Sequence, residues 1–391
     1  MRSQFLFVSL LLIGCGSPPD AFFDGGVDAG TWVDAGNRAD AGPLDGGVTD
    51  AGQQPSGLPI LGNGKHDLNS VDYLPVAGPA DGLSQPRDVA INPASPTDVW
   101  IVDSADNSMV IVKGFGTAQQ TKLKKSGTGS VHFMPKPAAL AFGAPNRLAT
   151  AHEQDQITQP TTPLDFMGPT LWPSDSSFEG GWASHLDMLH NSPDAVGIAW
   201  DSANIYWVFD GYHNALTRYD FGADHGPGGN DHSDGNIARC AQGQVSYLKG
   251  VSSGLEMDQS SKLLYVADSG NRRIAVLDTK VMPAGTTLSP NYDGATQRLI
   301  PGMTLTTLVN DLTSPLRRPS GLALRQGIVY VSDNETSRIL AFDLTGKLVD
   351  WLDLSLIVPT GGLMGIDFDA QGNLFFVDTA GSRVLRISGR P

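Results

Sequence analysis

One pattern recurs along the chain from Leu58 onward and limits the fold more than any other feature. In each copy a Pro or Gly precedes an apolar run, a second apolar run ends in Asp, and a short polar loop leads to a third run. The clearest copies begin at Gly254, Pro319 and Gly365, an earlier one at Pro86, and less regular ones at Pro137 and Val196. Apolar runs separated by turn residues are typical of β-strands, and β-rich units repeated every 40–60 residues or so predict a propeller.

We count six units, so residues 58–391 are predicted to form an all-β fold, a six-bladed β-propeller of four-stranded blades. The last unit ends at Ile387 with three visible strands. A strand at residues 71–77 is expected to complete it, which closes the ring and removes a sheet edge. The Asp that follows the second strand is expected to cap its own turn in the clearer units, at Asp103, Asp268, Asp333 and Asp378.

The run Tyr265-Val-Ala-Asp-Ser-Gly-Asn-Arg-Arg-Ile274 resembles the NHL repeat, and the resemblance extends over most of residues 58–391. It implies that the first strand of each blade lines a central channel. It also implies that a small molecule, peptide or protein binds on one face, where the loop leading into that strand meets the loop after the second strand.

The first 57 residues are predicted to be an export signal and a disordered tether. Residues 1–14 carry Arg2 and a short apolar run, as signal peptides do. Leu12-Ile13-Gly14-Cys15 resembles a bacterial lipobox, which implies lipidation of Cys15 and a stable membrane anchor. Residues 15–57 repeat Asp-Ala-Gly and Asp-Gly-Gly and hold too little apolar surface to fold. We therefore expect a lipid-anchored protein of the bacterial cell envelope, at the outer membrane or cell surface.

Composition narrows the partners. The net charge is −15, so no basic stripe can neutralise phosphates and nucleic acid is not expected to bind. Charged residues make up 17% of the chain beside 46 Gly and 26 Pro, which favours many short strands. Cys240 has no partner once Cys15 is lipidated, so it is expected to be a buried small hydrophobe in a monomeric protein.

Histidines concentrate in one part of the sequence. Five of the eight lie between Ser184 and Cys240, and His152 precedes them. On the predicted scaffold His152 ends a second strand, His190 precedes an inner strand with His185 close before it, and His213 follows a second strand. These positions share one face, so we expect copper or zinc at one mouth of the channel, bound by His152, His185, His190 and His213. The carboxylates expected to orient the ring nitrogens are Glu153, Asp187 and Asp210.

The loop at residues 222–235 raises a separate question. It holds Asp224, His225, Asp231, His232 and Asp234 among many glycines. It is either a structured Gly-rich turn or a second cation site, for which calcium is a candidate, on the opposite face of the ring. If the strand assignment shifts, all five histidines share one site. Residues 153–189 are longer than a blade connection needs, so this insertion is expected to form a lid or side wall over the mouth.

Three functions remain open at this point. The first is a surface-tethered metal-binding propeller. The second is an enzyme similar to the amidating lyases that cleave peptidyl-hydroxyglycine, in which three histidines hold zinc; the propeller lactonases are a more distant resemblance. Arg87 would then stabilise negative charge and Tyr212 would act as the base. The third is a protein-interaction scaffold without metal, because this fold does not fix function.

Overall fold

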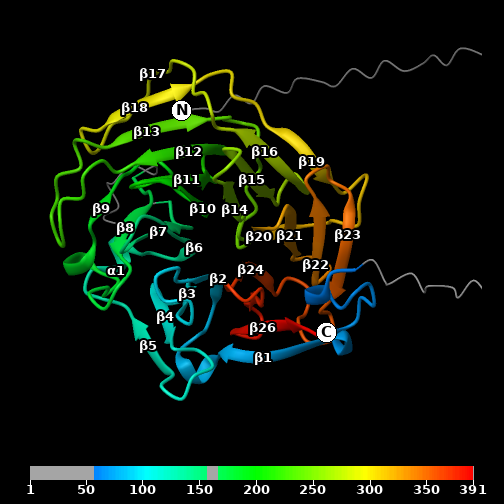
Figure 1. Cartoon of the computed structure of the whole chain (residues 1–391). Coiled ribbons are helices and arrows are strands. Elements are labelled where there is room, and N and C mark those ends of the chain that lie inside the picture. The colour runs from blue at the N-terminus through cyan, green and yellow to red at the C-terminus, as the bar shows by residue number, and fades with distance from the viewer. Residues whose placement is uncertain (1–56, 156–165, 391) are drawn as a thin grey trace, which may run out of the picture. The chain divides into compact units, whose positions relative to one another are not determined.

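The computed structural model describes residues 57–155 and 166–390, which form six β-sheets arranged as blades around a central channel (Figure 1). The predicted six-bladed β-propeller is thus confirmed. The inner strands of neighbouring blades contact one another in chain order, and the first blade contacts the last.

Each blade runs from an inner strand to an outer strand. Blade 1 holds β2 (Pro86–Ile91), β3 (Val99–Asp103), β4 (Ser108–Lys113) and β5 (Thr121–Lys125). Blade 2 holds β6 (Pro137–Phe142), β7 (Arg147–His152), β8 (Thr170–Pro173) and β9 (Asp187–Met188). Blade 3 holds β10 (Ala195–Ser202), β11 (Ile205–Asp210), β12 (Ala215–Asp220) and β13 (Asn236–Cys240), extended outward by β18 (Thr296–Ile300) and β17 (Thr286–Thr287).

Blades 4 to 6 complete the ring. Blade 4 holds β14 (Leu255–Asp258), β15 (Leu263–Asp268), β16 (Arg273–Asp278) and β19 (Thr306–Asn310). Blade 5 holds β20 (Pro319–Arg325), β21 (Ile328–Asp333), β22 (Arg338–Asp343) and β23 (Leu348–Asp353). Blade 6 holds β24 (Leu363–Phe368), β25 (Leu374–Asp378), β26 (Arg383–Gly389) and, on its outer edge, β1 (Val71–Ala77). The short helices are η1 (Pro59–Leu61), η2 (Leu68–Ser70), η3 (Pro79–Asp81), α1 (Ser130–Phe133) and η4 (Trp182–Ser184).

The ring is closed by pairing the N-terminal strand with the C-terminal one. β1 runs antiparallel to β26, with Val71 opposite Gly389 and Tyr73 opposite Ile387. The strand predicted at residues 71–77 therefore lies where it was expected. With β1, blade 6 has four strands, as blades 1 and 5 do.

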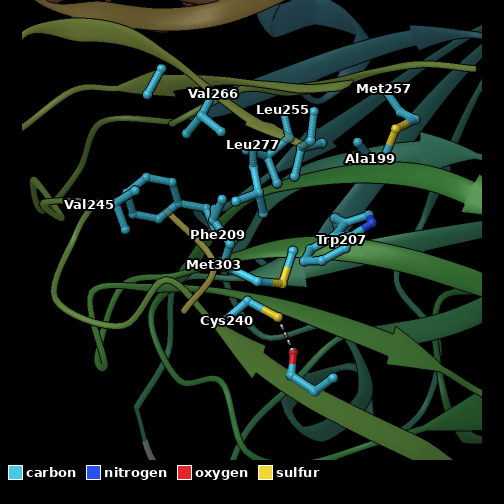
Figure 2. Packing of buried hydrophobic residues seen from close by; sticks show 14 of the residues in the cluster. Ala199, Trp207, Phe209, Cys240, Val245, Leu255, Met257, Val266, Leu277 and Met303 are labelled. Atoms are coloured by element: carbon cyan, nitrogen blue, oxygen red, sulfur yellow. Dashed lines mark hydrogen bonds between the residues drawn. The ribbon is translucent and has the colours of Figure 1, made fainter. Parts of the chain in front are cut away.

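The core is divided among the six contacts between blades. Each of the six clusters of buried apolar side chains joins the sheets of two neighbouring blades. Figure 2 shows the cluster between blades 3 and 4, where Trp207 and Phe209 of β11 pack near Met303 and Cys240. Both faces of a blade are covered, so its second strand is apolar along its whole length. Burying a side chain as large as Phe209 contributes about 1.5–3 kcal/mol.

Glycines permit the inner strands to approach closely. A Cβ atom on Gly197 of β10 would overlap the carbonyl oxygen of Ser253, next to the inner strand of blade 4. Gly321 of β20 meets Met364 of β24 in the same way. A narrow central channel requires glycine at these positions.

The recurring aspartates are structural, as expected. Asp333 is fully buried, and its carboxylate accepts hydrogen bonds from the backbone N–H groups of Arg317, Arg318, Glu335 and Thr336. Asp103 is likewise buried and accepts from the N–H groups of Ser84, Gln85 and Ala105. Each carboxylate thus joins the loop leading into its blade to the loop after the second strand.

Two segments differ from the sequence expectation. From Phe166 on, the stretch predicted as a lid supplies the outer strands β8 and β9, so blade 2 simply has longer connections than its neighbours. The true additional segment lies between β16 and β19. Its strand β18 pairs in parallel with β13, which widens blade 3 with residues that follow blade 4's third strand. At residues 279–305 apolar and polar residues alternate only weakly and turn residues are frequent, so the sequence does not predict these strands.

Candidate metal centre

Four ligand-type side chains meet at the outer flank between blades 2 and 3. His185 and Asp187 belong to the outermost strand region of blade 2, and His225 and His232 belong to the loop between β12 and β13. The backbone of this loop lies along blade 2, because His225 N donates to Leu186 O at 3.2 Å and Gly228 N donates to His185 O at 3.0 Å. The strand count is therefore as predicted, and the loop nevertheless reaches the neighbouring blade.

Asp187, His225 and His232 form the tightest group. One ligand atom of each residue lies within 4.8 Å of the other two. Asp187 is fully buried, and its Oδ1 lies 2.7 Å from Nδ1 of His232. Its second oxygen, Oδ2, is buried without a hydrogen-bond partner. Such orphaned buried oxygens are rare in native proteins, so this atom is available to a ligand.

The tautomer of His225 also favours ligation. Its Nδ1 lies 2.6 Å from the carbonyl oxygen of Gly226, which can only accept, so Nδ1 carries the proton. Nε2 then bears a lone pair, and it is buried with no partner. Metal-binding histidines are commonly held in this way by a hydrogen bond from the other ring nitrogen.

Burial and charge set the protonation states around the group. Burial raises the pKa of Asp187, against the opposing hydrogen bond from His232. Burial disfavours the charged form of His232, but the hydrogen bond and the negative charge of Asp187 outweigh it and raise the pKa of His232. Burial lowers the pKa of His185 to about 4, so this ring is neutral at pH 7. Its Nδ1 donates to Trp182 O at 2.6 Å, and its ring lies 4.9 Å from that of His225.

His190 lies near this group but has a different partner. Asp293, in the additional segment between β16 and β19, accepts from both the backbone N and Nδ1 of His190, each at 2.7 Å. The side chain is buried, and its Nε2 has no hydrogen-bond partner. His132 in α1 lies beside it, with ring centroids 6.0 Å apart. Figure 1 shows α1 beside β8 and β9.

Two of the four predicted ligands are placed elsewhere. Both ring nitrogens of His152 are engaged, Nε2 with Thr150 Oγ1 at 2.8 Å and Nδ1 with Gly168 O at 3.0 Å. Burial lowers the pKa of His152 to about 3. The ring of His213 packs edge-on against Tyr212, and its Nδ1 bonds to Asp210. In residues 57–155 and 166–390 no ring contact joins His152 or His213 to another histidine. Among the described residues, the group of ligand spacing consists of Asp187, His225 and His232, and none of the four predicted histidine ligands belongs to it.

The carboxylates expected at a second cation site form an ion pair and hydrogen bonds within the protein. Asp224 pairs with Arg147 at 2.6 Å, and Asp234 Oδ2 accepts from Ala223 N at 2.9 Å. Asp231 is exposed and accepts from both the backbone N–H and the hydroxyl of Ser233. Only the histidines of this loop join the metal-type group. The aspartates of this loop therefore stabilise a structured turn, and its two histidines belong to the candidate metal group.

Arg87 and Glu153 are bound to each other. Arg87 Nη1 lies 2.6 Å from Glu153 Oε2, and both side chains are buried. Glu153 Oε1 accepts from Tyr247 OH at 2.7 Å and from Gly250 N. Glu153 therefore connects the inner strand of blade 1 to the segment that leads into blade 4. Tyr212, the other candidate for catalysis, is 45% exposed.

The channel lies apart from the histidines. A cavity of about 510 Å³ is lined by the six inner strands. Three carboxyl groups face it, and burial raises their pKa values to about 7 for Asp88, 8 for Glu256 and 6 for Asp367. None of the described histidines lines this cavity. The histidine group is therefore at the rim of the ring and not at the channel mouth, where we expected it.

His132 and Asp293 are the residues that sequence reasoning missed. His132 precedes the inner strand of blade 2 just as His190 precedes that of blade 3. Applying the same rule to both segments would have found it. Asp293 gave no such signal, because it lies in the additional segment that the repeat pattern does not contain.

The fold and this site define the class of the protein as a six-bladed β-propeller. A family model described as NHL repeat matches residues 316–342, which include β20, β21 and most of β22. The protein therefore contains an NHL repeat, as the sequence resemblance implied. No curated protein matches the sequence.

In residues 57–155 and 166–390 no helix has the length and apolar character needed to cross a membrane. Cys15 and the predicted signal peptide lie outside the described residues.

Similar folds occur among solved structures. An auxiliary nutrient binding protein from Bacteroides ovatus has 15% sequence identity and a TM-score of 0.51, over 84% of this chain and 75% of that chain. Its counterpart from Bacteroides thetaiotaomicron has 10% identity and a TM-score of 0.53, over 78% and 69%. A protein of unknown function from Bacteroides thetaiotaomicron has 11% identity and a TM-score of 0.53, over 83% and 73%. At these identities the likeness concerns the fold alone.

Proposed function

We propose that this protein binds a divalent transition metal, zinc or copper, through Asp187, His225 and His232 at the flank between blades 2 and 3. We further propose that lipidated Cys15 holds the propeller at the bacterial cell envelope. The observation that carries the metal proposal is the pair of buried atoms without partners, Asp187 Oδ2 and His225 Nε2, within a three-residue group of ligand spacing.

The donor set suits zinc. Two imidazoles and one carboxylate are a common protein ligand set for Zn²⁺, and the fourth position is left to water or a bound molecule. Copper competes for the same ligands with higher intrinsic affinity. Metal binding would replace the hydrogen bond between His232 Nδ1 and Asp187 Oδ1, which now lie 2.7 Å apart. The metal joins a loop of blade 3 to the outer strand of blade 2, so it also fixes the two blades to each other.

The experiment is elemental analysis of the purified protein after reconstitution with zinc and removal of loosely bound metal. We expect about one equivalent of zinc in the parent. His225→Ala and His232→Ala are expected to lose it. His213→Ala is the matched control, since His213 is also partly buried and bonded to a carboxylate but lies outside the group. Zinc retained in both loop variants, or absent from a folded parent, contradicts the proposal.

A second candidate function is small-molecule binding in the channel, and the cavity favours it. Its wall combines carboxyl groups with apolar side chains such as Trp200 and Phe368, a combination that suits a ligand with both apolar and polar groups. Similar folds include proteins described as nutrient binding. A thermal-shift screen against small metabolites, repeated with Glu256→Gln, tests this candidate: no stabilising compound, or equal shifts in both proteins, contradicts it.

A further inference from the structure

Two more histidine nitrogens lack partners beside the proposed zinc site. They are Nδ1 of His132 and Nε2 of His190, and both are buried. The His190 residue is 4% exposed. A buried ring nitrogen without a hydrogen bond loses its hydration and gains nothing in return, unless another group binds it. Neither residue belongs to the group formed by Asp187, His225 and His232.

The hydrogen bond to Asp293 determines the tautomer of His190. A carboxylate can only accept, so Nδ1 of His190 carries a proton and Nε2 is the ring nitrogen left for a ligand. Burial, followed by the neighbouring His190, His185 and His232, lowers the pKa of His132 to about 4. Both His132 Nδ1 and His190 Nε2 are buried and have no hydrogen-bond partner, so both are open to a ligand. The two rings do not bond to each other directly, because their centroids are 6.0 Å apart.

This separation matches a bridging metal ion. A ring nitrogen lies about 1.1 Å from the centroid of its imidazole, and a metal–nitrogen bond is about 2 Å long. Two imidazoles on opposite sides of one ion therefore have centroids about 6 Å apart.

The surroundings are aromatic. Phe166 stacks on His190 with centroids 4.0 Å apart, and Phe133 contacts His132 edge-on at 4.6 Å. Asp293 reaches His190 only through Nδ1, the nitrogen opposite the open one. The position thus offers two nitrogen ligands among aromatic side chains. A structural Zn²⁺ site needs four ligands, which this pair does not supply. Imidazole also suits copper, and Cu⁺, unlike Zn²⁺, forms linear two-coordinate complexes.

We propose that His132 and His190 form a second metal position that takes Cu⁺. It uses ligand atoms different from those of the zinc site, so it does not depend on the function proposed above. His132 is only partly buried, and its neighbour Val131 is 66% exposed.

The test is an anaerobic titration of the zinc-loaded full-length protein with Cu⁺ under ascorbate, in competition with a chromophoric Cu⁺ chelator. We expect one Cu⁺ per chain in the parent, in His213→Ala and in His225→Ala. X-ray absorption should show two short copper–nitrogen bonds. His132→Ala and His190→Ala should lose Cu⁺ while keeping zinc.

The outcomes separate the two proposals. A folded parent protein that takes up Cu⁺ but holds no zinc would refute the zinc site alone. Failure of the folded parent to compete for Cu⁺, or undiminished uptake in His132→Ala, would refute the copper position. His190 is buried and paired with Asp293, so His190→Ala is interpreted only where its circular dichroism matches the parent. Where His190→Ala does not fold, the test rests on His132→Ala, because the His132 side chain is partly exposed and its removal should not disturb the fold.

Discussion

The ion pair between Arg87 and Glu153 gives a sharp prediction of stability. Glu153→Ala would leave the buried guanidinium with no acceptor, because Nε and Nη2 of Arg87 already lack partners. Breaking one side of a buried pair costs about 3–5 kcal/mol. Arg87→Met should cost less, about 2 kcal/mol, because Glu153 keeps hydrogen bonds from Tyr247 and Gly250.

The double variant Arg87→Met/Glu153→Ala completes the mutant cycle and distinguishes this reasoning from simple loss of packing. It removes both charges, so its free energy of unfolding should exceed the value expected from adding the two single losses by about 2 kcal/mol. Urea unfolding followed by tryptophan fluorescence measures all four proteins. Strict additivity, or a Glu153→Ala cost below about 1 kcal/mol, would refute the claim that the pair connects the blades across the channel.

The pair also has a pH signature. Burial raises the pKa of Glu153, but the Arg87 charge and the hydrogen bonds outweigh this and lower it. The ionised carboxylate therefore stabilises the protein above the unfolded pKa of about 4.3. This contribution is lost as pH falls through the folded pKa. Arg87→Met should shift the acid-unfolding midpoint to higher pH, and an unchanged midpoint would count against the pair.

Four further outcomes are expected. Asp333→Ala should lower the free energy of unfolding in urea by about 3 kcal/mol or more, because several backbone N–H groups lose their acceptor. A loss of only about 0.5 kcal/mol, as is usual for an exposed residue, would contradict this. Cys240 is buried and burial raises its thiol pKa to about 12, so maleimide should label it only in denaturant. Zinc affinity should fall as pH drops through the raised pKa of His232, whose proton competes with the metal, and a flat profile from pH 8 to 5 would argue against that ligand. Deleting residues 58–77 removes several buried apolar side chains and should abolish cooperative thermal unfolding in calorimetry.

The scaffold was predictable because each blade repeats one local pattern. Apolar runs, turns and the capping Asp recur in Leu263–Asp278 and Ile328–Asp343, so counting them yields the blade number and the closing strand. The histidine site was only partly predictable. Repeat position correctly places His190 before an inner strand, but it cannot show that the loop carrying His225 leans on the neighbouring blade. That contact depends on the length and shape of one connection, which no repeat encodes.

The errors have the same origin. His152 occupies a strand end that resembles a ligand position, yet Thr150 and Gly168 satisfy both of its nitrogens. Whether a histidine is free or engaged depends on side chains distant in sequence. Asp293 is a partner that the sequence did not reveal, since it hydrogen-bonds to His190 from 103 residues away in the sequence.

The pairing of β1 with β26 has a consequence for the order of assembly. A chain made from its N-terminus presents β1 first, but its partner strand comes some three hundred residues later in the sequence. The earliest strand must therefore wait, unpaired, until the last has been synthesised. Five blades can form before the ring can close, so β1 can pair with a wrong sheet edge until β26 is available.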